Sequence, residues 1–175
     1  ENQNLTTGVI VYENLGTKHS DRYQYTLPYY DFSKNITTLI SDNSINGSLN
    51  FYSSGTNKLS NTNNLRTTVV NDLNYTSNDF ISKLGFKNNF DLYFKNLNAV
   101  GKNDSIYTSN AQIDGMSILK IDTSYPLLRS QNTIEESLTP KISFRLNPGN
   151  NMDNYSGTAR NINVDNIYDI NRLGL

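Results

Sequence analysis

Histidine, cysteine and clustered carboxylates are the side chains that most often build catalytic or metal-binding sites, and this sequence offers few of them. His19 is the only histidine, and cysteine is absent. A Ser-His-Asp triad or a histidine metal site would depend on this one residue in a Gly/Ser/Asp-rich turn, where a solvated loop histidine is expected. Asp165 and Asp169 share a strand face, but Asn163 and Asn171 flank them, which favours a hydrated surface over a calcium site. We therefore predict no enzyme, no metal site and no cofactor.

Basic side chains offer a second kind of chemistry, the binding of anionic groups. They lie at odd-numbered positions in and beside two segments, 80–94 and 138–146, whose even positions are largely apolar. If the apolar side chains face lipid, the basic ones point into a lumen, where they could meet anionic groups of a substrate or of a plugging partner. A hydrated lining without specific contacts is the alternative. The lumen-facing candidates are Lys83, Lys87, Lys95, Lys141 and Arg145.

Nucleic-acid binding is not expected. The isoelectric point lies near 5.8, and no basic cluster is present that would neutralise phosphates.

The segment 80–94 is the clearest element that positions these residues. Its apolar residues recur at every second position, which is the period of a strand with one apolar face. It is longer than the roughly 5 to 6 residues of a usual soluble strand, and it exceeds the about 9 to 11 residues with which a tilted strand crosses a membrane. With segment 138–146 it supplies the lipid-facing candidates Phe80, Leu84, Phe86, Phe90, Leu92, Phe94, Ile142, Phe144 and Leu146.

Eight strand-like segments recur along the chain, at residues 5–13, 23–32, 45–52, 65–75, 80–94, 116–128, 138–146 and 162–170. The short stretch between residues 75 and 80 predicts a tight hairpin. Longer polar loops are expected at 55–64, 96–112 and 147–160, and we assign these loops, around Gly55, Gly101 and Gly149, to the outside. The prediction is one domain over 1–175, an all-β, antiparallel transmembrane β-barrel segment of about eight meandering strands that leaves the barrel incomplete.

The composition agrees with a segment of a β-barrel. Only 35% of the residues are hydrophobic, which argues against a thick core, whereas 12 Tyr, 7 Phe and a net charge of −1 argue against disorder. A barrel strand buries only alternate residues and can stay polar on average. The first residues do not resemble a signal peptide, so we expect either a processed protein or an internal piece of a longer one.

Two stretches near the end of the chain resemble a known family. Residues 138–149 read LTPKISFRLNPG, and residues 163–174 read NVDNIYDINRLG. They are similar to the Leu-x-Pro-Lys/Arg strand, the Pro/Gly loop and the Asp/Asn-rich strand ending in Asn-Arg-Leu/Phe-x-Gly of the lipopolysaccharide-assembly outer-membrane protein family LptD, the organic solvent tolerance proteins. Weaker similarities precede them in the same order.

The resemblance implies transport and assembly of lipopolysaccharide (LPS) at the bacterial outer membrane. In that family a large barrel is plugged by the lipoprotein LptE, receives LPS through a periplasmic domain fed by an LptA-like bridge protein, and releases LPS sideways between its first and last strands. This chain resembles a middle slice of that barrel, so no residue of the lateral opening is carried over.

Two other interpretations stay open at this stage. A small closed outer-membrane barrel or adhesin would pair its first strand with its last, around Val9 and Val164. A secreted carbohydrate-binding β-sandwich would use Tyr and Asn for binding and would have a dry core between two sheets. A barrel wall would instead expose Phe86, Phe90 and Phe94 as one apolar band.

Overall fold

The computed structural model describes residues 2–16, 23–38, 46–61, 63–131 and 134–148 of the chain. All the regular structure in these ranges is β-strand, and no helix there is long and apolar enough to cross a membrane. The strands are β1 (Asn2–Glu13), β2 (Tyr23–Thr38), β3 (Gly47–Ser60), β4 (Asn64–Ser77), β5 (Phe80–Ile81), β6 (Lys87–Lys102), β7 (Gln112–Ser124), β8 (Leu127–Gln131), β9 (Ile134–Leu138) and β10 (Lys141–Leu146).

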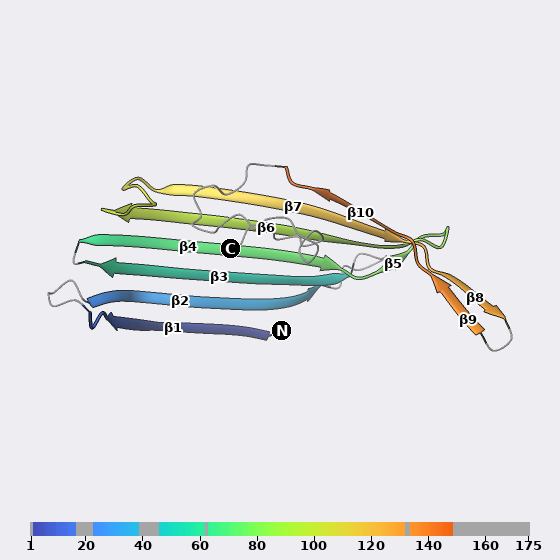
Figure 1. Ribbon diagram of the computed structural model, residues 1–175, viewed down its shortest axis with the longest axis horizontal. Helices are drawn as coiled ribbons and strands as arrows, with labels where there is room; N and C mark the ends of the chain where they lie inside the picture. Colours follow the sequence, from blue (N-terminus) through green and yellow to red (C-terminus); the bar gives the residue numbers. More distant parts are fainter. Residues whose placement is uncertain (1, 17–22, 39–45, 62, 132–133, 149–175) are drawn as a thin grey trace.

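One antiparallel sheet contains most of these strands (Figure 1). Its order is β1-β2-β3-β4-β6-β7-β10, with β5 paired to the start of β6. Strands β8 and β9 form a separate hairpin that projects beyond one end of the sheet. The predicted all-β, antiparallel fold is therefore confirmed. In the described part of the chain the sheet is open, because β1 pairs only with β2 and β10 only with β7.

Strand β3 extends through the region where the sequence predicts an external loop at 55–64. The residues there are polar, but they pair in register with β4. Thr56 Oγ1 lies 2.9 Å from Thr68 Oγ1, and Thr67 Oγ1 donates to Asn57 Oδ1 at 2.8 Å. Cross-strand hydrogen bonds between polar side chains stabilise a sheet as apolar pairs do, so a polar run continues the strand.

The segment 80–94 is not one strand, and this prediction was wrong. Strand β5 ends at Ile81, and a turn follows in which Gly85 N donates to Ser82 O at 2.9 Å and Ser82 N donates to Phe86 O at 2.8 Å. Gly85 has a φ of +85°, which other residues rarely adopt. Phe80 pairs with Asn88 across this turn, and β4 pairs directly with β6 instead of forming the predicted hairpin.

Other predicted boundaries also shift. Strand β6 continues to Lys102, so the loop before β7 covers only residues 103–111 and Gly101 lies in a strand. Strand β7 ends at Ser124, and the last residues of the predicted strand at 116–128 belong to β8, which pairs with β9. The predicted strand at 162–170, Gly149, His19 and the motif at 163–174 lie outside the described residues.

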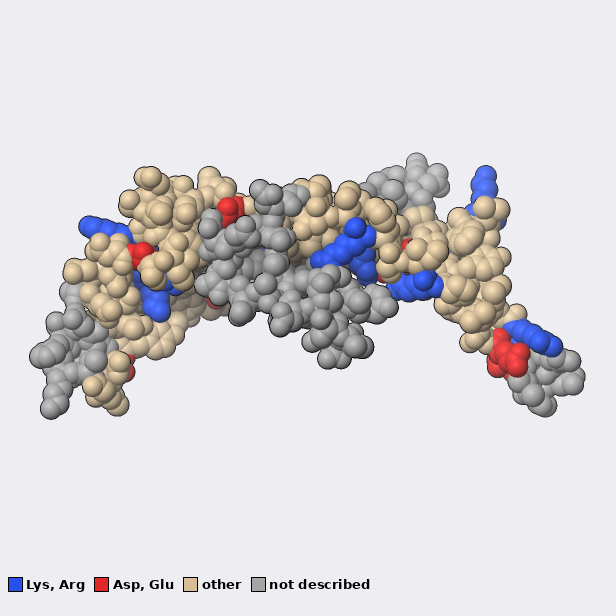
Figure 2. All heavy atoms as spheres, turned by 45° about the horizontal axis from the view of Figure 1, so that its top comes forward, with Lys and Arg blue, Asp and Glu red and all other residues tan. Residues whose placement is uncertain are grey.

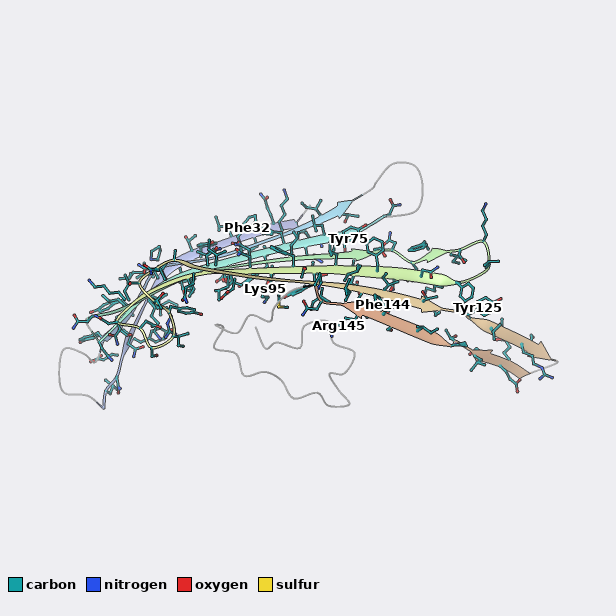
Figure 3. All side chains as sticks on the ribbon, turned by 90° about the horizontal axis from the view of Figure 1, so that it is seen from above. Phe32, Tyr75, Lys95, Tyr125, Phe144 and Arg145 are labelled. Atoms are coloured by element: carbon teal, nitrogen blue, oxygen red, sulfur yellow. The ribbon has the colours of Figure 1, made fainter. Side chains whose placement is uncertain are left out.

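The sheet curves along the length of its strands (Figure 3). Register shifts occur between Gly8 and Ile10 in β1 and between Thr26 and Tyr29 in β2. Bulges of this kind increase the local twist of a sheet. On the face shown in Figure 2, Lys and Arg lie in several separate groups rather than in one patch.

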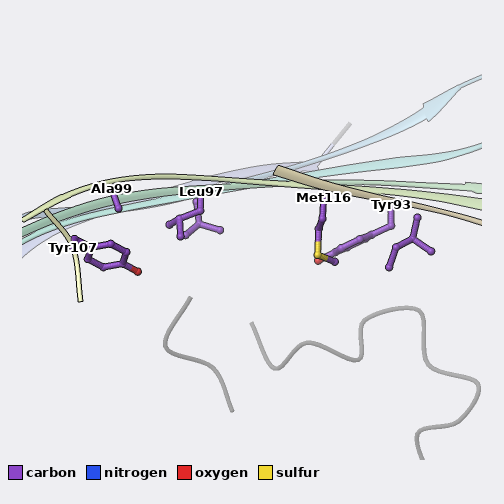
Figure 4. Close-up of a cluster of buried hydrophobic side chains, with 7 residues drawn as sticks. Tyr93, Leu97, Ala99, Tyr107 and Met116 are labelled. Carbon is purple, nitrogen blue, oxygen red and sulfur yellow. The ribbon is translucent and has the colours of Figure 1, made fainter. Parts of the chain in front are cut away.

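The hydrophobic core is small. Its buried side chains lie together on one face of β4, β6 and β7 and on the loop after β6 (Figure 4). Leu97 is the most buried of them. The members are Val70, Tyr93, Leu97, Ala99, Tyr107, Met116 and Ile118.

Candidate functional site

The sheet has one face that carries aligned apolar side chains, named here the apolar face. In antiparallel strands, directly opposed residues point to the same side, so the register defines this face. Leu49 pairs with Tyr75, Tyr75 with Leu92, and Leu92 with Leu119. The apolar face consists of Leu49, Phe51, Leu73, Tyr75, Phe90, Leu92, Phe94, Leu119, Ile121, Ile142, Phe144 and Leu146, with Ile36 and Phe32 on β2.

The opposite side, named here the charged face, holds most of the ionisable residues of the sheet. On the apolar side the charged residues are Glu13, Lys34 and Lys102. On the other side they are Asp31, Lys58, Arg66, Asp72, Lys87, Asp91, Lys95, Asp114, Lys120, Asp122, Lys141 and Arg145. Phe32 and Tyr75 lie on one side of the ribbon and Lys95 and Arg145 on the other (Figure 3).

The structure brings together six of the nine residues that the sequence predicts to face lipid. Phe90, Leu92 and Phe94 on β6 meet the side chains of Ile142, Phe144 and Leu146 on β10 through Leu119 and Ile121 on the strand between them. Five of the six side chains are exposed, with Phe94 44% and Phe144 57% exposed, and Phe90 is half-buried.

Phe80 on β5 lies on the same side of the sheet, because it is directly opposed to Asn88 of β6. Leu84 and Phe86 do not join this group. They lie in the turn after β5, and Phe86 packs on Tyr125, with 4.9 Å between ring centroids.

The apolar stripe crosses the strands obliquely. On β10 it is centred on Phe144, which is in register with Phe90. On β6 it is centred on Leu92, and on β3 it is centred between Leu49 and Phe51, which are in register with Leu92 and Phe94. With about 3.4 Å per residue and about 4.8 Å between strands, this drift inclines the stripe by roughly 30° to the perpendicular of the strands.

Four of the five predicted lumen-facing cations lie on the charged face: Lys87, Lys95, Lys141 and Arg145. Lys83 does not, because it lies in the turn between β5 and β6. Lys95 is buried and its Nζ lies 3.0 Å from Asp72 Oδ1, while Lys87 Nζ lies 2.8 Å from the exposed Asp79.

A carboxylate also pairs with the cations of β7 and β10. Asp122 Oδ2 lies 2.8 Å from Lys120 Nζ and 3.3 Å from Lys141 Nζ, and Asp122 Oδ1 accepts a 2.5 Å hydrogen bond from Ser143 Oγ. Arg145, two residues after Ser143 on the same face of β10, is directly opposed to Lys120 of β7. Sequence reasoning missed these carboxylates, although Asp72 and Asp122 occupy the positions between the apolar residues of their strands, where a charged-face partner is expected.

The loop at 103–111 folds back over one end of the charged face. Asp104 Oδ1 accepts hydrogen bonds from the backbone N–H groups of Ile106 and Tyr107 at 2.8 and 3.0 Å, and Asp104 Oδ2 accepts one from Arg66 Nε at 2.8 Å. The Arg66 guanidinium also lies 5.6 Å from the centroid of the Tyr107 ring. Burial alone would raise the pKa of Asp104, but the hydrogen bonds from Arg66 and from the two backbone groups outweigh it and lower the pKa to about 2.

Nothing in the described ranges gathers three or more metal-ligating side chains. In the described residues, the fold and the two faces define a class of protein instead: an open antiparallel sheet with one exposed apolar face and one face that carries paired charges together with the small hydrophobic core. Comparisons of the chain with protein-family models, with curated proteins and with solved structures gave no match.

Proposed function

We propose that this chain forms part of the wall of a β-barrel in the bacterial outer membrane, with its apolar face toward lipid and its charged face toward the lumen. The observation that carries the proposal is the separation of charge between the two faces of one long-stranded sheet. Transmembrane barrels alternate lipid-facing apolar residues with lumen-facing polar ones along each strand. In water, an exposed apolar area of this extent would promote aggregation.

The length of the strands also supports a membrane-spanning barrel wall. The strands from β1 to β7, other than β5, have 12 to 16 residues, and about 9 to 11 residues cross a membrane when a strand is tilted. The stripe inclination of roughly 30° approaches the tilt of about 35–45° of such strands. A β-sandwich would instead cover Leu92 and Phe94 with a second sheet, yet each side chain is 44% exposed.

Ion pairing on the charged face suits a water-filled lumen. A buried charge is costly unless it is paired and hydrogen-bonded, and the buried Lys95 and half-buried Lys120 each lie within 4 Å of a carboxylate, as does the exposed Lys141. Such pairs keep a polar wall near neutral, so the lining tolerates both sugars and anionic groups.

We further propose that the barrel transports and assembles lipopolysaccharide at the outer membrane. Support comes from the resemblance of 138–149 and 163–174 to the LptD family. In the first stretch, β10 alternates Ile142, Phe144 and Leu146 on the apolar face with Lys141 and Arg145 on the charged face. The partners are then an LptE-like lipoprotein plug, an LptA-like periplasmic bridge protein, outer-membrane lipid and lipopolysaccharide itself.

Photo-crosslinking in cells tests this function. A photoreactive amino acid at Lys141 or Arg145, in the full protein in its native membrane, should form adducts with lipopolysaccharide. At Phe144, on the opposite face of the same strand, adducts should form with phospholipid or with the hydrocarbon chains of the outer leaflet. Absence of lipopolysaccharide adducts at both charged-face positions, in protein that fractionates with the outer membrane, would refute the transport function and leave the barrel wall in place.

A further inference from the structure

The loop at 103–111 is unusually well fixed for a surface connection. Gly101 N, near the end of β6, donates to Thr108 O inside the loop at 2.8 Å, and Asn103 Nδ2 donates to Asn63 O in the neighbouring turn at 3.2 Å. Asp104 accepts three further hydrogen bonds, two from the loop backbone and one from Arg66 of β4. Loops that only connect strands are usually mobile and lack such contacts.

The position of the loop matters as much as its rigidity. Tyr107 is only 6% exposed and lies beside Ala99 and Leu97 on the charged side of the sheet (Figure 4). A Cβ added at Gly101 would lie 2.6 Å from Tyr107 O and 2.7 Å from Asp104 Cβ. The chain therefore has a glycine where the loop lies directly on the sheet, and the loop covers the charged face instead of extending past the strand ends.

We propose that the loop at 103–111 is a constriction loop, held against the charged face by Arg66, Asp104 and Tyr107, that limits the size of solutes passing along that face; this rests on the proposed function. A loop on the lumen wall narrows the passage by the width of its own backbone and side chains. Its anchoring carboxylate is fixed by ionic and backbone hydrogen bonds, which are stronger than neutral ones. The constriction is consequently a built part of the wall.

The test compares Asp104→Ala with Asp79→Ala in the full protein reconstituted into planar bilayers. Asp79 is the matched control, because it also pairs with a basic residue, Lys87, but at the other end of β6 and at an exposed site. Asp104→Ala should raise amide hydrogen exchange in 103–111 about ten-fold or more and should raise ion conductance about two-fold or more. Asp79→Ala should change neither.

Three results would overturn the constriction. They are faster exchange with unchanged conductance, unchanged exchange, and equal effects of the two substitutions. Arg66→Ala provides a second variant if Asp104→Ala fails to fold, and the same changes in exchange and conductance are expected of it. Failure of the wild-type protein to insert into lipid would instead refute the barrel wall, so the two failures are distinguishable.

Discussion

Lys95 on β6 and Asp72 on β4 form an ion pair across the charged face, with 3.0 Å between Nζ and Oδ1 and only 2% of Lys95 exposed. The two residues are directly opposed in the register. Tyr93 Oη also lies 3.4 Å from the same Asp72 oxygen. Burying a lysine this deeply is costly unless a carboxylate pairs with it, and the opposing strand supplies that carboxylate.

Replacing one member of this pair should therefore destabilise the sheet. Lys95→Met leaves Asp72 without its cation, and we expect a loss of about 3 kcal/mol in the free energy of unfolding. Urea titration of the protein folded in detergent micelles measures this loss.

The double variant Lys95→Met/Asp72→Leu is the control for pairing. It should recover much of the loss, since no charge is then left unpaired. Additive losses in the double variant would show that the two residues do not stabilise each other.

Gly55 and Tyr30 provide a second test, on the apolar face. They are directly opposed, and a Cβ added at Gly55 would lie 2.8 Å from Tyr30 Cδ1. Gly55→Ala should thus displace the tyrosine ring and destabilise the sheet by about 1–3 kcal/mol. The double variant Gly55→Ala/Tyr30→Ala should be no less stable than Tyr30→Ala alone, because the clash is then absent. Urea midpoints of the three variants check this, and a neutral Gly55→Ala would contradict the contact.

Acid should loosen the loop at 103–111. The pKa of Asp104 falls from an ordinary 3.8 to about 2 in the folded chain, so the carboxylate stabilises the folded loop at every pH above about 4. That stabilisation, about 2 kcal/mol, is lost as the pH falls from about 4 to 2. Amide exchange of 103–111, corrected for its intrinsic pH dependence, should rise only in this window, and Asp104→Asn should abolish the pH-dependent step.

Lys87 and Arg145 should differ in their response to charge reversal. Lys87 pairs with the exposed Asp79, and exposed pairs contribute little, so Lys87→Glu should leave the urea midpoint unchanged. Arg145 is directly opposed to Lys120, so Arg145→Glu replaces a cation of the charged face with a carboxylate and should reduce lipopolysaccharide delivery to the cell surface. Urea titration measures the midpoint of Lys87→Glu, and the amount of surface lipopolysaccharide in cells carrying each variant measures delivery. Unchanged delivery with both reversals would refute contact between these side chains and the substrate.

The sequence predicts the all-β, antiparallel sheet and its two-face pattern because both follow from alternation within a strand. Phe90, Leu92 and Phe94 lie on one face and Lys95 on the other, and their spacing alone is sufficient to predict this. The structure shows the same alternation on β10 with Phe144 and Arg145.

Strand boundaries were less predictable, and the reason is physical. Where both faces are polar, alternation disappears, yet the strand continues through cross-strand hydrogen bonds such as Ser53 Oγ to Asn71 Oδ1 at 2.7 Å and Asn71 Nδ2 to Asn96 Oδ1 at 3.1 Å. Those partners are far apart in sequence. Conversely, Phe80, Leu84 and Phe86 occupy even positions as if they belonged to one strand with Phe90. This spacing is a coincidence, because a turn at Gly85 separates β5 from β6.

The ion pairs were missed for a related reason. Lys95 and Asp72 meet only because β4 pairs with β6, across the short β5 and its turn. A single sequence does not reveal that skipped pairing. The Arg66–Asp104 contact likewise joins residues on a strand and on a distant loop.

Lipid contact of the apolar face is the central claim, and tryptophan quenching tests it most directly. The chain has no tryptophan, so Phe94→Trp and Tyr52→Trp each introduce one reporter in place of an aromatic residue. The two positions are matched, with 44% and 40% exposure on opposite faces. In bilayers of lipids brominated on their acyl chains, fluorescence should fall about two-fold or more for Phe94→Trp and stay nearly unchanged for Tyr52→Trp. Equal quenching of both, or quenching of neither, would contradict a membrane wall with the apolar face toward lipid.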